Sequence, residues 1–138
     1  MIKAVIFDID NTLYSYDENH IYGMEALAVY CRDSFGITTD EMQACYRKAG
    51  RIMTDRIGTD TAAIHSRMLR MQCMLELLEQ PLFPHARNMY HAYWDTFIQH
   101  IQSNPGILEF MKELKKRKIR IGIGTDMTAY VQYRKLEA

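Results

Sequence analysis

The sequence predicts an α/β fold in which a small parallel sheet carries a large helical insertion. Two apolar segments, at residues 3–8 and 119–124, have the length and residue types of buried strands. Between them, a long stretch repeats its apolar side chains at helical spacing. These observations divide the chain into a core at residues 1–15 and 103–138 and a helical cap at residues 16–102.

The first strand leads directly into two carboxylates. Residues 4–7 are continuously apolar, as expected for a parallel strand covered on both faces, and Asp8 and Asp10 follow. Residues two apart in an extended chain point the same way, so the two carboxylates would share one side. Because like charges held together favour a cation between them, and Mg²⁺ prefers oxygen ligands, the pair predicts a metal-assisted carboxylate site.

Four helical segments are expected in the insertion. The first ends near Gly36, and Thr38 with Glu41 has the capping-box spacing that begins the second, which Gly58 ends. Prolines 81 and 84 end the third, and Pro105-Gly106 ends the fourth. The apolar positions that define the four are Ile21, Met24, Leu27, Ala28 and Cys31; Met42, Cys45, Tyr46 and Ala49; Ile64, Met68, Met71, Leu75 and Leu78; Met89, Tyr93, Phe97 and Ile101.

The chain then returns to the core. Asn104 has the residue type of an N-cap, with Pro105 at the first position of a helix whose buried face carries Ile107, Phe110, Met111 and Leu114. In the strand that follows, isoleucines alternate with Arg120 and two glycines, which suggests close packing on the glycine face. Thr125 and Asp126 come next, and residues 129–136 resemble the start of a further helix.

The order strand, insertion, helix, strand is that of a βαβ unit, the building block of a Rossmann-like sheet. Ligands of such sheets bind beyond the carboxyl ends of the strands. Asp8 and Asp10 lie at one of these ends, and Thr125 and Asp126 lie at the other. We therefore expect the two polar clusters to meet in one site.

Composition excludes several classes of function. The formal net charge is zero, which argues against nucleic acid as a partner. No apolar window approaches the length of a membrane helix, and no signal peptide is recognisable. The three cysteines and five histidines show no zinc-ligand spacing. A cytoplasmic protein with reduced thiols is the expected case.

The motifs resemble those of the haloacid dehalogenase superfamily. The first motif of that superfamily, DxDxT after a strand, is matched by Asp8, Asp10 and Thr12, and the second by Thr125. The resemblance implies a Mg²⁺-dependent phosphatase acting on a small phosphorylated metabolite, with Asp8 as nucleophile and Asp10 as general acid and base. It further implies Asp8 and the Asp10 backbone as metal ligands, and a phosphate hydrogen bond from Thr125. Thr12 is expected to steady the loop or to contact the substrate phosphate, and Asp126 to bind phosphate or orient the loop.

The C-terminal part of that fold has no counterpart in the sequence. The third motif is a lysine tens of residues after the second, and the fourth is acidic, whereas only residues 127–138 follow Asp126. By element spacing, Lys135 is too close to Thr125 to be that lysine. The expectation is an N-terminal portion, truncated and lacking the cation and further metal ligands. An inactive binding module that self-associates through its uncovered sheet edge stays open as the alternative.

Overall fold

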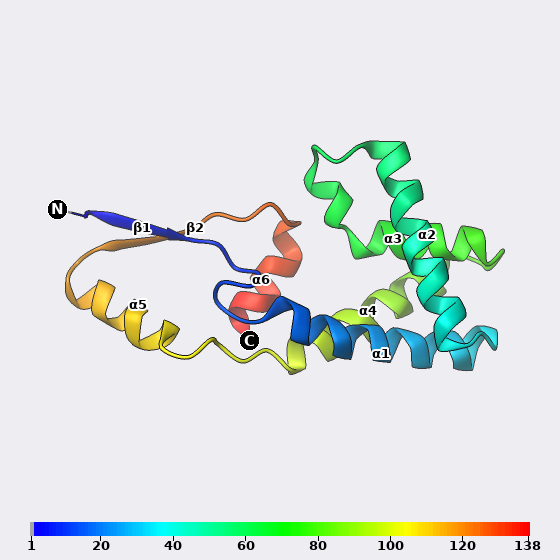
Figure 1. Ribbon diagram of the computed structural model, residues 1–138, viewed down its shortest axis with the longest axis horizontal. Coiled ribbons are helices and arrows are strands. Elements are labelled where there is room, and N and C mark those ends of the chain that lie inside the picture. The colour runs from blue at the N-terminus through cyan, green and yellow to red at the C-terminus, as the bar shows by residue number, and fades with distance from the viewer. Residues whose placement is uncertain (1) are drawn as a thin grey trace.

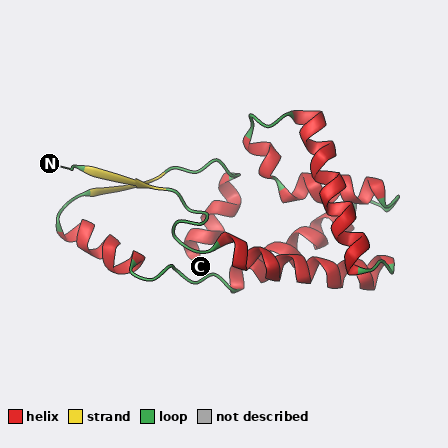
Figure 2. Ribbon diagram, viewed as in Figure 1, coloured by secondary structure: helices red, strands yellow, loops and turns green. Residues whose placement is uncertain are grey.

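The computed structural model describes residues 2–138 as two strands, six α-helices and one short 3₁₀ helix. The molecule is elongated: the two strands lie at one end and helices α1 to α4 at the other, with α6 between them (Figure 1). Figure 2 shows how strongly helix dominates the architecture. None of the helices among residues 2–138 combines the length and apolar character needed to span a membrane.

The sheet pairs β1 (Ala4–Phe7) with β2 (Arg120–Ile123) in parallel, from Ala4 opposite Arg120 to Phe7 opposite Ile123. Both predicted strands are therefore confirmed. The expectation that β1 is covered on both faces is wrong, because Ile6 is 75% exposed. Cβ atoms added to Gly122 and Gly124 would lie 3.6 and 3.3 Å from the Ile6 side chain, so the only side chain of residues 2–138 that approaches the glycine face is that of the neighbouring strand.

The helices between the strands begin and end largely where the sequence predicts. They are α1 (Tyr16–Phe35), α2 (Thr39–Ile57), the 3₁₀ helix η1 (Ala62–His65), α3 (Arg67–Leu77) and α4 (His85–Gln99). Gly36 ends α1 in the left-handed conformation, at φ +70°. The capping box of Thr38 and Glu41 is formed in both directions, which confirms the predicted start of α2.

One hydrophobic cluster joins these helices to the loop after β1 and to α6 (Ala129–Glu137). Its centre is the aromatic side chains of α4, Tyr93, Trp94 and Phe97, which are fully buried. Val131 of α6 belongs to the same cluster. The division into a core and a cap stays a prediction, since the described residues form a continuous interior across the proposed boundary.

Several predicted boundaries and faces are wrong. Ile64 lies in η1, because the chain turns at Ser66 before α3 begins, and Ile101 lies beyond the end of α4. Ile21 of α1 is 58% exposed, so it lies outside the buried face of that helix. Phe110 is 48% exposed, so the buried face of α5 (Ile107–Lys116) is narrower than its apolar pattern predicts.

Asn104 is not the N-cap of α5. The helix begins at Ile107 after Gly106, whose φ of +80° only glycine adopts without strain. Asn104 instead binds the loop after β1: its backbone N–H donates to the Leu13 carbonyl at 2.8 Å and its Nδ2 to the Thr12 carbonyl at 2.9 Å. The side chain has a tertiary partner, and this competes with the local cap.

We expect Gly23→Ala to destabilise the protein and Gly50→Ala to leave its stability nearly unchanged. An added Cβ at Gly23 would lie 2.7 Å from the buried Tyr93 ring, whereas one at Gly50 meets the movable end of Arg70 at 3.1 Å. Overpacking a filled interior lowers the free energy of unfolding by about 1–3 kcal/mol, and alanine gains up to about 1 kcal/mol over glycine in a helix. Urea unfolding measures both; equal effects of the two substitutions would contradict the packing of α1 on α4.

Candidate active site

The loop after β1 places Asp8 and Asp10 in different environments. Asp8 is exposed, Ile9 is buried at 1% exposure, and Asp10 is partly buried. The backbone N–H groups of Thr12 and Leu13 both donate to the Ile9 carbonyl, at 3.2 and 2.9 Å, so the chain turns sharply just after Asp10. The turn keeps both carboxylates at the carboxyl end of β1.

Asn11 connects this turn to the first helix. Its φ of +56° is a left-handed conformation that asparagine tolerates better than most residues. The Asn11 Oδ1 accepts a hydrogen bond from the backbone N–H of Tyr16 at 2.8 Å, at the first residue of α1. Because Asn104 holds the carbonyls of Thr12 and Leu13 from the other side, the loop is fixed at both ends.

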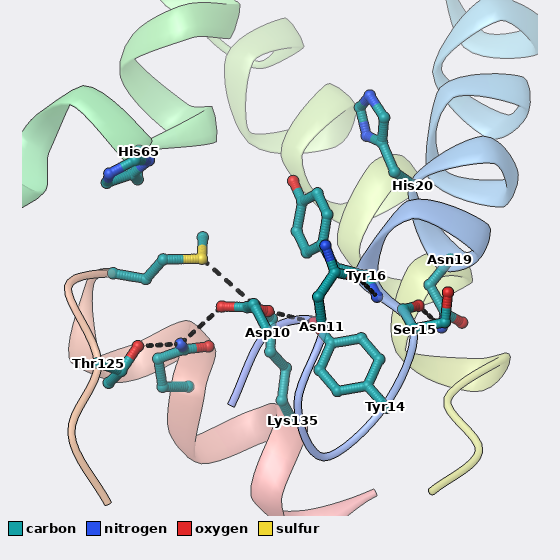
Figure 3. A network of polar contacts seen from close by, with 12 residues as sticks. Asp10, Asn11, Tyr14, Ser15, Tyr16, Asn19, His20, His65, Thr125 and Lys135 are labelled. Atoms are coloured by element: carbon teal, nitrogen blue, oxygen red, sulfur yellow. Dashed lines mark hydrogen bonds and ion pairs between the residues drawn. The ribbon is translucent and has the colours of Figure 1, made fainter. Parts of the chain in front are cut away.

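The carboxylate of Asp10 is the centre of a polar cluster, seen in Figure 3 with Thr125 and Tyr14 on either side of it. Its Oδ1 accepts hydrogen bonds from the Tyr14 hydroxyl and from Lys135 Nζ, the latter at 2.5 Å. Its Oδ2 accepts one from Gln132 Nε2 at 2.9 Å. Three donors from two segments thus orient one carboxylate.

Lys135 is a buried cation: its side chain has no exposed surface, and that of Asp10 is 20% exposed. Burial and, more weakly, the charge of Arg67 lower the pKa of Lys135, while the hydrogen bond and charge of Asp10 and the weaker charge of Asp8 act in the opposite direction. Burial and the Asp10 carboxylate raise the pKa of Tyr14, so its hydroxyl stays protonated and donates. The cluster therefore holds Asp10 as a hydrogen-bond acceptor.

Gln132 connects the two predicted halves of the site. Its Nε2 donates to Thr125 Oγ1 at 2.6 Å as well as to Asp10. Thr125 follows β2, whose ladder with β1 is extended by a hydrogen bond from the Gly124 N–H to the Phe7 carbonyl at 2.9 Å. The structure thus brings Asp10 and Thr125 together at the carboxyl ends of both strands.

The remaining predicted residues lie around this cluster rather than in it. Asp8 makes no hydrogen bond or ion pair with any side chain of residues 2–138. Asp126 is 82% exposed, and its Oδ2 lies 3.5 Å from His65 Nε2 of η1. The Thr12 carbonyl is held by Asn104, in keeping with a structural role for this residue.

The candidate metal ligands suit magnesium better than a metal that takes all of its ligands from protein side chains. Across residues 2–138, no three acidic, histidine or cysteine side chains converge as a metal site would require. Magnesium, however, commonly uses one or two carboxylates and completes its shell with water and substrate phosphate. The uncommitted carboxylate of Asp8 fits that pattern, whereas the Asp10 side chain is occupied by its three donors.

Sequence reasoning missed the residues that hold Asp10. It set Lys135 aside and expected no cation at the site, which is wrong, because the ammonium of Lys135 lies on Asp10. A signal was present: Gln132 and Lys135 are three apart and so share one face of the predicted helix at 129–136. Val131, which is apolar, lies on the same face, so this face is expected to be buried. Two polar residues on a buried face indicate a polar contact inside the protein.

Comparisons with known sequences indicate one protein family. The sequence model of haloacid dehalogenase-like hydrolases matches residues 2–138. A curated relative, the ribulose-1,5-bisphosphate 5-phosphatase of Halopiger xanaduensis, is 34% identical over 139 residues. That match covers 99% of this chain and 58% of the relative, so the chain spans little more than half of its length.

Two solved structures share the fold. The HAD-hydrolase YfnB from Bacillus subtilis, described as bound to magnesium, superposes with a TM-score of 0.60 at 15% identity and covers 99% of this chain and 59% of its own. A haloacid dehalogenase-like family hydrolase from Xanthomonas campestris gives a TM-score of 0.57 at 16% identity, over 99% and 55% of the two chains. At these identities the likeness concerns the fold alone.

Proposed function

Because this chain belongs to the haloacid dehalogenase-like hydrolases, we propose that it carries the nucleophile and the acid/base of a Mg²⁺-dependent phosphatase. The observation that carries the proposal is the single polar cluster in which Gln132 joins Asp10 to Thr125 beside the uncommitted Asp8. Nucleophile, proton carrier and phosphate-binding hydroxyl then lie at one sheet edge, where ligands of parallel sheets bind.

In the proposed reaction, an oxygen of Asp8 attacks the phosphorus of the substrate and forms an aspartyl-phosphate. The bond to the leaving oxygen breaks, and that oxygen takes the proton of Asp10, which must be in its carboxylic acid form when substrate binds. Asp10 then removes a proton from water, whose oxygen attacks the phosphorus, releases inorganic phosphate and restores Asp8. Thr125 donates a hydrogen bond to a phosphoryl oxygen throughout.

The exposure of the two carboxylates supports these roles. Asp8 is exposed and without a side-chain partner, as a nucleophile that must reach a phosphate requires. Asp10 is held as an acceptor by Tyr14, Gln132 and Lys135, which suits the base of the second step. Magnesium, bound by Asp8 and the Asp10 backbone, would neutralise charge between the nucleophile and the phosphate.

The proposed substrate is a small phosphorylated sugar. Support comes from the relative whose name specifies a 5-phosphatase of ribulose-1,5-bisphosphate. Nucleic acid and membrane partners are not proposed, because the net charge is zero and the described helices include no membrane span. Three free thiols, Cys31, Cys45 and Cys73, favour a reducing compartment such as the cytoplasm.

We expect turnover of p-nitrophenyl phosphate by the purified chain to depend on Mg²⁺. Chelation by EDTA should abolish phosphate release, and added Mg²⁺ should restore it, because one carboxylate alone leaves the charge of the phosphate uncompensated. Colorimetric phosphate detection measures the rate. Turnover that persists unchanged in EDTA would contradict the metal assignment, and no turnover above background would contradict catalysis by this chain.

A binding module that self-associates is the second candidate. The observation that favours it is the exposed apolar side chains of the sheet: Ile6 is 75% exposed on one face, and Ile123 is 40% exposed on the other. Light scattering as a function of concentration distinguishes the two candidates. A dimer that forms at micromolar concentration and is dissociated by Ile6→Lys, in a chain without phosphatase activity, would favour the second.

A further inference from the structure

The helical part holds two arginines that no carboxylate of the described chain neutralises by an ion pair. Arg67 and Arg70 of α3 make no ion pair within 4.0 Å in the described chain. Their Nε atoms are enclosed and have no hydrogen-bond partner there. An enclosed, unsatisfied donor on a cation is costly, and such groups often mark the place of a missing ion or ligand.

The rings packed on these arginines are aromatic, and the nearest charged group on the Asp10 side is another cation, Lys135. The Arg67 guanidinium lies 5.9 Å from the Tyr46 ring centre and 5.6 Å from that of Tyr93, and Arg70 lies 4.7 Å from the Tyr46 ring. Burial and the two arginines lower the pKa of His20 to about 4, so this imidazole is neutral near pH 7. Asp17 acts on His20 but forms no ion pair with either arginine.

Contacts place Arg67 opposite the catalytic loop. It follows His65 by two residues, and His65 Nε2 lies 3.5 Å from Asp126 Oδ2, next to Thr125. In Figure 3, His65 faces the Asp10 cluster from the side opposite Lys135. The Arg67 Nη2 donates to the Tyr16 hydroxyl, and the Tyr16 ring lies 5.4 Å from Lys135 Nζ. One tyrosine and one ammonium thus separate Arg67 from Asp10.

A guanidinium has five N–H donors and pairs with phosphate through two of them at once. Arg67 uses Nη1 for a long hydrogen bond of 3.5 Å to the His65 carbonyl and Nη2 for the Tyr16 hydroxyl. The residue is partly exposed, although its Nε is enclosed. Its charge and unused donors suit a second anion, at a distance from the phosphate that reacts at Asp8.

We infer that Arg67, assisted by the charge of Arg70, binds a second phosphate of the substrate, so that the site selects bisphosphates over monophosphates. The inference rests on the proposed function for the position of the reacting phosphate. The second phosphate is not cleaved; it fixes the orientation of the substrate and decides which end meets Asp8. Arg67 is thereby a specificity-determining residue.

The test compares α,ω-alkanediol bisphosphates of three to six carbons with the matching monophosphates, in the presence of Mg²⁺. Affinity is measured by calorimetry and phosphate release in parallel. We expect at least one chain length to bind about tenfold more tightly as the bisphosphate, the scale of one charge-assisted bidentate contact. Arg67→Gln should reduce that ratio to near one.

Arg51→Gln is the matched control, because Arg51 is an exposed arginine of α2 and its loss changes the net charge equally. Arg51→Gln should keep the wild-type ratio of bisphosphate to monophosphate affinity. Arg67→Lys keeps the charge but loses the bidentate geometry, so the ratio should fall only partway; this variant decides the matter if Arg67→Gln does not fold by circular dichroism.

The inference would be overturned if the wild type bound no alkanediol bisphosphate more tightly than its monophosphate. It would also be overturned if Arg67→Gln and Arg67→Lys both kept the full wild-type preference for the bisphosphate. Absence of phosphate release with a retained, Arg67-dependent binding preference would instead overturn the proposed catalysis and support the anion site.

Discussion

Asp8→Asn should reduce phosphate-ester turnover by at least about 10³-fold, because it removes the nucleophile that every later step requires. The effect should appear in kcat, with little change in the free energy of unfolding. Asp8 is exposed and makes no side-chain hydrogen bond or ion pair among the described residues, so an isosteric amide breaks no such bond. Steady-state kinetics with p-nitrophenyl phosphate measures the loss.

The control for Asp8→Asn is Asp55→Asn, which removes the same charge from an exposed position on α2. Its turnover should equal that of the wild type, since surface charges far from the reacting group change rates little at moderate salt. Asp8→Asn with turnover near that of the control would show that another group attacks phosphorus, and the assignment of the nucleophile would be wrong.

Lys135→Met should lower the free energy of unfolding by about 3 kcal/mol, within the range expected when one partner of a buried ion pair is removed. The Lys135 side chain is fully buried, and its Nζ lies 2.5 Å from Asp10 Oδ1. Methionine preserves much of the volume, so the loss reflects the carboxylate left without its cation. Urea unfolding followed by circular dichroism measures the change.

A double-mutant cycle separates the interaction energy between Asp10 and Lys135 from the effect of changing each side chain alone. Combining Lys135→Met with Asp10→Asn removes both charges, and the double variant should be more stable than the sum of the single effects by at least about 1 kcal/mol. Lys112→Met, at an exposed lysine of α5, should be nearly neutral. Additive effects at Asp10 and Lys135 would contradict a direct ion pair between them.

Local signals predicted most of the fold. The apolar runs found both strands, and the capping box and glycines found the limits of α2, because these features act over a few residues. Burial was predicted less well: Ile6 and Phe110 are apolar yet exposed, since the pattern of an element does not state which partners cover it. Asn104 has the residue type of a cap but binds the loop after β1, a tertiary contact that competes with the local one.

The candidate site was predicted in part for the same reason. The position of Asp8, Asp10 and Thr125 at one sheet edge could be predicted because they follow strands closely, and parallel strands end at one edge. Lys135 and Gln132 could not be assigned to Asp10 in advance, since 125 and 122 residues separate them from it. Only the packing of α6 on the insertion, with Arg134 2.6 Å from Asp95 of α4, brings them there.

Trapping a phosphoryl mimic tests most directly whether Asp8 accepts a phosphoryl group. Beryllium fluoride forms a stable adduct with a nucleophilic carboxylate and requires magnesium, and its fluorine signal can be followed by nuclear magnetic resonance without any turnover. We expect a protein-bound fluorine resonance in the wild type with Mg²⁺ that is absent from Asp8→Asn and from samples in EDTA. A folded wild-type chain without that resonance, or a resonance of equal intensity in Asp8→Asn, would contradict phosphoryl transfer to Asp8.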